Sequence, residues 1–208
     1  MARFHRATIT PTKDELIAAW VPTRPWGPAA GVEIEVIGTY RIDDPDGEVG
    51  MENFLVRAGD DVLHVPLTYR DAPLDGSGPT LVGVMEHSVL GTRYVYDGVS
   101  DPRAVTMLAA VAMTGQGEAL GMAVYDGRWY VAPTNVRIAG GGWTLERVPL
   151  DAFELVGEDA STAVLRNDRF ELTVWRRPQL GERPALGLAA SWDGGAPLVV
   201  AAVRDLGA

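Results

Sequence analysis

Four side chains in the first half of the sequence have the chemistry of metal ligands: His64, His87, Glu52 and Glu86. The two histidines fall in different apolar runs, so a folded sheet could bring them together. Zinc sites use histidine nitrogens and carboxylate oxygens at recognisable spacings, and the spacing here matches none of them. Structural roles on strands are the simpler interpretation, so we expect no metal site and no cofactor.

Acidic side chains cluster at Asp43, Asp44, Asp46 and Glu48. A calcium-binding loop needs ligands at alternate positions over a longer segment, with a late glutamate. This run is too compact and contains Pro45, so a solvated turn between two strands is the better interpretation.

Aromatic residues could form a stacking surface for a sugar or another flat ligand, although aromatics on a sheet more often lie in the core. These residues are Trp20, Trp26, Tyr40, Tyr69, Tyr94 and Tyr96. No serine lies in a G-x-S-x-G elbow, and neither a Walker A motif nor a dinucleotide fingerprint occurs in the sequence. The residues alone therefore predict no complete active site.

The composition restricts the class of protein. The net charge of −10 argues against a nucleic-acid partner, which needs a basic surface. Cysteine is absent, so disulfides and thiolate sites are excluded, and Lys13 is the single lysine among eighteen basic residues. No segment approaches the roughly 18 apolar residues of a membrane span, and the first residues lack the apolar core of a signal peptide. We expect a cytoplasmic protein that does not bind membranes.

The candidate residues lie within an alternating apolar and polar pattern that predicts an antiparallel meander over residues 31–96. Thr12 and Glu15 have the spacing of a capping box, so a helix over 12–20 should lie across the concave face of this sheet. Pro66 predicts an edge or a bulge in the third strand. The expected strands are 32–42, 49–57, 62–69, 80–87 and 92–96.

The second half of the sequence begins with a predicted helix over 100–114, followed by a glycine-rich joint over 115–121. A weaker helical segment is expected over 184–192. The expected strands are 121–125, 129–138, 143–149, 153–156, 163–165, 170–176 and 198–203.

Three segments of the first half resemble the N-terminal cap of bacterial maltokinases and related aminosugar kinases. They read TPTKDELIAAWVPTRPWG, YRIDDPDGEVGMENFLVRAGDDVLHVPLTYRDAPL and LVGVMEHSVLGTRYVYDGVSDP. The resemblance implies a cystatin-like cap, a curved antiparallel sheet wrapped on a helix, attached to the N-lobe of a kinase-like fold. The expected fold class is α+β, with a smaller β-rich unit after the cap.

Residues 153–178 resemble the first kinase strands of that family, which carry a G-E-Q-S-N-T-S phosphate-side loop and a strand ending L-K-L-F-R-R. The resemblance places Gly157, Ser161 and Thr162 in the loop, and it places Thr173 where the family has its phosphate lysine. Phosphoryl transfer needs cations at the phosphates, and a threonine supplies none. These positions are therefore interpreted as a degenerate nucleotide site without catalytic residues.

The resulting organisation is a cap over 1–100, a connecting helix and joint over 101–118, and a degenerate N-lobe over 119–208. No H-G-D-like segment of a catalytic lobe occurs in the sequence. We expect a non-catalytic module that binds a partner protein or a small ligand, linked to maltose, trehalose or α-glucan metabolism. The alternatives are a kinase subunit completed by a separate catalytic chain, a hydrolase using the sheet's histidines, and an orphan structural remnant.

An association is also expected, because a kinase N-lobe covers its inner face with a C-lobe. The candidates for an uncovered apolar face are Phe170, Val174, Trp175 and the strand over 198–203. A homodimer or a kinase-like protein would cover this face. The opposing interpretation is that these side chains pack inward on their own sheet.

Overall fold

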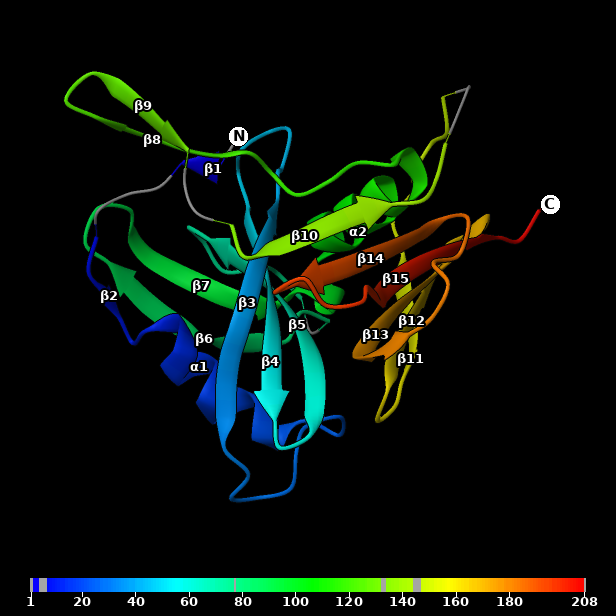
Figure 1. Ribbon diagram of the computed structural model, residues 1–208, viewed down its shortest axis with the longest axis horizontal. Coiled ribbons are helices and arrows are strands. Elements are labelled where there is room, and N and C mark those ends of the chain that lie inside the picture. The colour runs from blue at the N-terminus through cyan, green and yellow to red at the C-terminus, as the bar shows by residue number, and fades with distance from the viewer. Residues whose placement is uncertain (1, 4–6, 77, 132–133, 144–146, 208) are drawn as a thin grey trace.

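The computed structural model describes residues 2–3, 7–76, 78–131, 134–143 and 147–207. Within these residues two six-stranded antiparallel sheets lie side by side, and a separate hairpin projects from them (Figure 1). The fold is α+β and mostly β. No helix among the described residues is long and apolar enough to cross a membrane.

The first sheet is the predicted meander, with strand order β2-β6-β7-β5-β4-β3. Alternate side chains of its strands point to opposite faces, and both faces are covered by other elements. The ladder from β3 to β4 slips by one residue between Val36 and Gly38, which increases the curvature of the sheet. Its strands are β2 (Ile9–Thr10), β3 (Ile34–Ile42), β4 (Gly50–Ala58), β5 (Asp61–Arg70), β6 (Leu81–His87) and β7 (Gly91–Asp97).

Helix α1 (Lys13–Trp20) covers one face of this sheet and is followed by a 3-10 turn, Val21–Thr23. The predicted capping box is present: the Thr12 hydroxyl accepts from the Glu15 N–H, and the Glu15 carboxylate accepts from the Thr12 N–H at 2.7 Å. Leu16, Ile17 and Trp20 then pack on apolar side chains of β4, β5, β6 and β7. A helix of eight residues is marginal alone, so this packing is what stabilises it.

Strand β5 departs from the expectation of an edge strand, because it has neighbours on both sides. Pro66 pairs with Asn53 of β4, whereas the ladder to β7 begins only at Leu67. The proline therefore lies just outside the second ladder, where its missing N–H leaves no bond unmade. At Pro66 the strand is therefore paired with β4 alone, as an edge strand would be. The β4–β5 ladder has no bulge at this residue.

Helix α2 (Pro102–Thr114) follows the 3-10 turn Gly98–Ser100 and lies between the two sheets. Asp101 caps its first turn, Pro102 occupies the first helical position, and Gly115 ends it with a left-handed φ of 66°. Val105, Leu108 and Ala109 belong to a continuous core that includes residues of both sheets. The glycine-rich joint is held in place, since the Ala119 N–H donates to the Arg41 carbonyl at 2.8 Å.

The second sheet has the strand order β10-β14-β15-β13-β12-β11. Its successive strands β11, β12 and β13 form a meander, and β15 pairs with β13 and β14. The strands are β10 (Val136–Gly140), β11 (Glu154–Glu158), β12 (Thr162–Arg166), β13 (Phe170–Leu180), β14 (Gly187–Trp192) and β15 (Leu198–Asp205).

Three predictions for the second half were wrong. The segment over 184–192 is not a helix, because residues 187–192 form β14 between β10 and β15. The strand expected over 129–138 is divided into β9 and β10, with residues 132–133 outside the described part. Residues 143 and 147–149 carry no strand, and residues 144–146 of that prediction lie outside the described residues.

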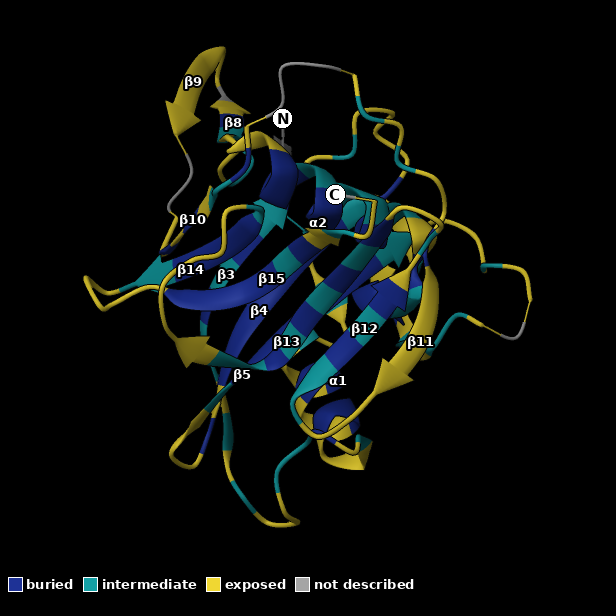
Figure 2. Ribbon diagram, turned by 90° about the vertical axis from the view of Figure 1, so that its right-hand side faces the viewer, coloured by how far each residue is buried: buried dark blue, intermediate teal, exposed yellow. Residues whose placement is uncertain are grey.

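The apolar face expected to be uncovered is instead covered within the protein. Phe170 and Val174 are fully buried and belong to the core shared with α2 and the first sheet. Strand β15 is likewise buried along most of its length (Figure 2). The inward packing of these side chains is the correct interpretation, while Trp175 lies on the opposite face and is half-buried.

The projecting hairpin consists of β8 (Gly121–Tyr125) and β9 (Arg128–Val131), and β1 (Ala2–Arg3) pairs parallel with β8. Met122 pairs with Val131, and Val124 pairs with Trp129, so these four side chains share one face. Trp129 is 64% exposed and Val131 is 73% exposed. The hairpin thus presents an apolar face to solvent.

Candidate functional site

The predicted nucleotide positions of the second sheet lie close together. Ser161 is in the turn from β11 to β12, Thr162 begins β12, and Thr173 lies on the neighbouring β13. Val164 pairs with Gly157 on one side and Thr173 on the other, so these three residues form one row across the sheet. The structure therefore places the four residues on neighbouring strands of one sheet.

The turn between β11 and β12 is closed by its own carboxylate. Asp159 Oδ1 accepts from the backbone N–H groups of Ser161 and Thr162, both at 2.7 Å. These hydrogen bonds stabilise the ionised form and lower the pKa of the Asp159 carboxyl. The amides that would otherwise face a phosphate already have an anionic acceptor.

The residues paired directly with Thr173 are uncharged. Its direct neighbours across the sheet are Val164 on β12 and Ala202 on β15. Both arginines that follow on β13 are engaged elsewhere: Arg176 is buried between the sheets, and Arg177 binds Asp61 and the Trp26 carbonyl. The phosphate position thus has no positive charge from its closest strand neighbours.

The four metal-ligand candidates are not brought together. His64 and Glu52 lie on opposite faces of the first sheet, since Glu52 shares the face of Phe54 and His64 lies one residue out of phase with Leu63 and Val65. Glu86 accepts from the Thr92 hydroxyl at 2.9 Å. Within the described residues no group of three His, Asp or Glu side chains could hold a metal ion.

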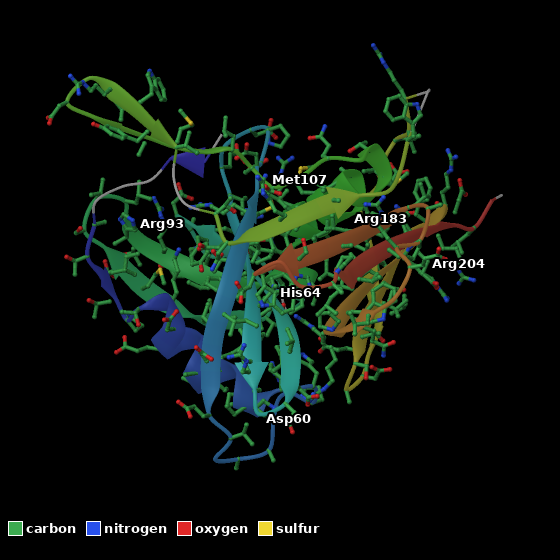
Figure 3. The ribbon with its side chains drawn as sticks, in the orientation of Figure 1. Asp60, His64, Arg93, Met107, Arg183 and Arg204 are labelled. Carbon is green, nitrogen blue, oxygen red and sulfur yellow. The ribbon has the colours of Figure 1, made fainter. Side chains whose placement is uncertain are left out.

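His64 is buried between the two sheets (Figure 3). Its Nε2 lies 2.8 Å from the Tyr40 hydroxyl, and the two rings are stacked with centroids 6.0 Å apart. Burial, together with the positive charge of Arg176, lowers the pKa of His64 to about 3. This imidazole is therefore neutral in the folded protein at physiological pH, which is the structural role expected for it.

Arg176 connects the second sheet to the first through buried charges. Its guanidinium donates to Asp97 at the end of β7 and to Glu158 on β11, the latter at 2.8 Å. It also stacks over the Trp26 ring, with its carbon 4.5 Å from the ring centroid. Three segments of the chain thus meet at one fully buried cation.

The acidic cluster is a turn, as predicted, but it is less solvated than expected. Asp44 accepts from the backbone N–H groups of Glu48 and Val49 at 3.0 Å, and its side chain is only 1% exposed. Arg103 of α2 forms ion pairs with Asp44 and Asp46. The cluster therefore closes a hairpin and holds it against α2.

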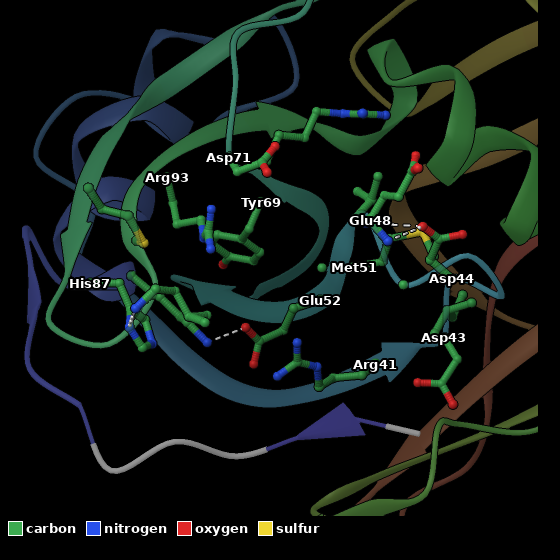
Figure 4. Close-up of a pocket in the computed structure, with 18 of the residues that line it drawn as sticks. Arg41, Asp43, Asp44, Glu48, Met51, Glu52, Tyr69, Asp71, His87 and Arg93 are labelled. Carbon is green, nitrogen blue, oxygen red and sulfur yellow. Dashed lines mark hydrogen bonds and ion pairs between the residues drawn. The ribbon is translucent and has the colours of Figure 1, made fainter.

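A cleft of about 990 Å³ lies on the face of the first sheet that carries α1, next to the N-terminal end of that helix (Figure 4). Arg93 and His87 line one end, and acids of the β3–β4 turn line the other. Tyr69, Glu52 and Gly50 form the floor between them. Further lining residues include Lys13, Arg41, Met85, Arg70 and Asp71.

The floor of the cleft combines charge with an aromatic ring. Lys13 forms an ion pair with Glu52, and its Nζ lies 5.3 Å from the centroid of the Tyr69 ring. The Tyr69 hydroxyl is buried and has no hydrogen-bond partner among the described residues. Burial and then the charge of Glu52 raise the pKa of this hydroxyl well above its ordinary value.

Sequence reasoning missed this cleft, because its side chains come from α1 and from six strands. Two signals pointed toward it: Lys13 is the single lysine, and Gly50 is a glycine within a strand, which often marks a close approach or a free space. Of the predicted aromatic surface, Tyr69 alone lines the cleft, while Trp20, Trp26 and Tyr40 are buried in the core.

Comparison with known proteins finds a similarity in the first part of the chain. Residues 20–101 match the family model described as the maltokinase N-terminal cap domain. This match covers β3 to β7 and ends at Asp101, the residue that caps α2. A comparison with curated proteins found no match.

Proposed function

We propose that the protein is a non-catalytic binding module of the maltokinase-like family, because residues 20–101 match the model of the maltokinase N-terminal cap domain. Its role would lie beside maltose, trehalose or α-glucan metabolism, where it binds a partner protein or a small ligand. The second sheet would be a degenerate kinase N-lobe. The proposal agrees with the cap match, and the chemistry of the second sheet supports its non-catalytic part.

The observation that carries the proposal is the closed turn between β11 and β12. In protein kinases a glycine-rich loop covers the phosphates, and the phosphate lysine lies on the third strand. The corresponding turn here is occupied by the Asp159 carboxylate, which accepts from Ser161 and Thr162. A nucleotide phosphate approaching this turn would be repelled by that carboxylate and would find its amide donors already bonded.

Thr173 gives independent support from the third strand of the same meander. A hydroxyl cannot neutralise the charge that develops during phosphoryl transfer, and Val164 and Ala202 beside it add none. The nearest arginines on this face, Arg166 and Arg204, both pair with Glu171.

The test is a turnover assay with ATP, magnesium and a panel that includes maltose and glucosamine. We expect no phosphorylated sugar and no binding of ATP by calorimetry. Thr173→Tyr serves as the matched variant, because a bulky ring at this position would block any nucleotide on that face. Turnover by the wild type that disappears in Thr173→Tyr would refute the proposal, whereas trace turnover unchanged by the substitution comes from a contaminating kinase.

A further inference from the structure

We infer that the cleft on the α1 face of the first sheet binds a hydroxyl-rich small molecule that carries one oxyanion, a phosphate or a carboxylate, seated at Arg93. This inference does not depend on whether the second sheet binds nucleotides. It concerns the first sheet alone. It follows from which charged groups of the cleft form ion pairs and which do not.

Arg93 is a cation of the cleft that forms no ion pair among the described residues. It extends from β7 into the cleft, is half-buried, and shares the α1 face with Met85, its partner across the β6–β7 ladder (Figure 4). Among the described residues its guanidinium makes one long hydrogen bond, 3.5 Å to the Thr92 carbonyl, and no ion pair. Arg70, which also lines the cleft, is by contrast held by two 2.7 Å hydrogen bonds to Asp101.

A guanidinium offers several N–H donors in a planar fork that matches the oxygens of phosphate and carboxylate. Leaving such a group half-buried without an anion is unfavourable unless another group supplies one. His87 lies at the same end of the cleft, where its Nδ1 accepts from two backbone N–H groups of the β6–β7 turn at 3.2 and 3.1 Å.

The floor next to Arg93 adds two features that favour an anion. Lys13 lies over the Tyr69 ring, and its ion pair with Glu52 would have to open before it could contact an anion. The Tyr69 hydroxyl is buried near Glu52 and can donate to a ligand oxygen once the side chains over it adjust. Arg93, Lys13 and Tyr69 come from three different elements and converge on this end of the cleft.

The opposite end of the cleft has the reverse character, and this restricts the rest of the ligand. Asp43, Glu48 and Asp71 line it with carboxylates. Carboxylates accept hydrogen bonds from hydroxyl groups and repel a second anion. A molecule with one oxyanion and a body rich in hydroxyl groups fits both ends, whereas a dianion with charges at both ends does not.

Gly50 provides both the space and a steric test. A Cβ built at Gly50 would lie 3.5 Å from the Tyr69 Cβ and 3.7 Å from Arg41 Nη2, which are ordinary contacts. A larger side chain at this residue would therefore extend over the floor without a clash in the strand. The volume of about 990 Å³ leaves ample room for a small ligand in the native cleft.

The experiment is isothermal titration calorimetry of the full chain with glucose 6-phosphate, gluconate, glucose and inorganic phosphate. We expect glucose 6-phosphate or gluconate to bind and neutral glucose to fail, and the comparison of the first two identifies which oxyanion is preferred. Arg93→Gln should weaken binding about tenfold, because it removes charge-assisted hydrogen bonds. Arg57→Gln is the matched control, since Arg57 lies on the opposite face of the same sheet and pairs with the exposed Glu35.

Gly50→Leu tests the location without changing any charge. We expect it to abolish binding while circular dichroism and thermal unfolding stay close to those of the wild type. Absence of binding by every probe at millimolar concentration would overturn the inference. Binding that is equal in the wild type, Arg93→Gln and Gly50→Leu would overturn it as well, because the ligand would then occupy another site.

Discussion

Replacing the buried imidazole by His64→Gln should remove much of the pH dependence of stability between pH 7 and pH 5. In the folded protein the pKa of His64 is about 3, because burial and then the charge of Arg176 disfavour the imidazolium. In the unfolded chain a histidine has a pKa near 6.5. Below about pH 6.5 the unfolded state binds a proton at His64 that the folded state does not bind. The free energy of unfolding therefore falls as the pH falls.

The magnitude follows from these two pKa values. At pH 5 the unfolded histidine is almost fully protonated, and its protonation favours the unfolded state by about 2 kcal/mol relative to pH 7. The loss continues at about 1.4 kcal/mol per pH unit until the pH approaches the folded pKa. Glutamine is neutral at every pH and can still hydrogen-bond to the Tyr40 hydroxyl, so the variant lacks this contribution.

The assay is urea unfolding followed by tryptophan fluorescence at pH 7 and pH 5. We expect the free energy of unfolding of the wild type to fall by about 2 kcal/mol more than that of His64→Gln over this range. His87→Gln is the control, because it removes an imidazole from the rim of the cleft and retains the contribution of His64. Equal pH dependence in the wild type and in His64→Gln would show that the buried imidazole is not held neutral.

Three further predictions concern stability and association. Asp97→Asn should lower the free energy of unfolding by about 3 kcal/mol, measured by urea titration, because Arg176 stays buried while losing a charged partner. Thr12→Ala should cost about 1 kcal/mol in the same assay, since the N-cap of a short helix is lost; a change near zero would mean that packing alone holds the helix. Light scattering should give the mass of a homodimer for the wild type and of a monomer for Trp129→Ser/Val131→Ser, because the hairpin leaves this apolar face uncovered. A monomeric wild type would contradict the association.

The first sheet could be predicted closely, because its information is local. The alternation of Val32, Ile34 and Val36, the turn at Gly47 and the capping box at Thr12 each specify an element with no knowledge of the rest of the chain. The structure departs from the expected bounds of its strands by at most two residues, and α1 lies on the predicted face.

The errors occur where a neighbour in space decides the outcome. Residues 184–192 begin with a proline and are rich in alanine, a composition that suits a helix. In the structure Leu188 and Ala190 instead pair in the second sheet and belong to the core that includes α2. Phe170 and Val174 showed that one face of β13 is apolar. Only the position of α2 shows that this face is covered from within the protein.

The cleft was beyond sequence reasoning for a related reason. Arg93 and Tyr69 are 24 positions apart in the sequence, and Tyr69 and Lys13 are 56 positions apart, so nothing in their local context connects them. Their convergence depends on the register between β5 and β7 and on where α1 begins over the sheet. The predicted nucleotide residues, in contrast, came together because a meander places consecutive strands side by side.

The ion pair between Lys13 and Glu52 gives the protein a practical property. Because Lys13 is the single lysine, it carries the one side-chain primary amine in the sequence. An amine-reactive dye would therefore attach no other side-chain amine, and it would place a fluorophore at the floor of the cleft. The rate of labelling would report how often the salt bridge opens, and protection by an added compound would measure occupancy without any engineered cysteine.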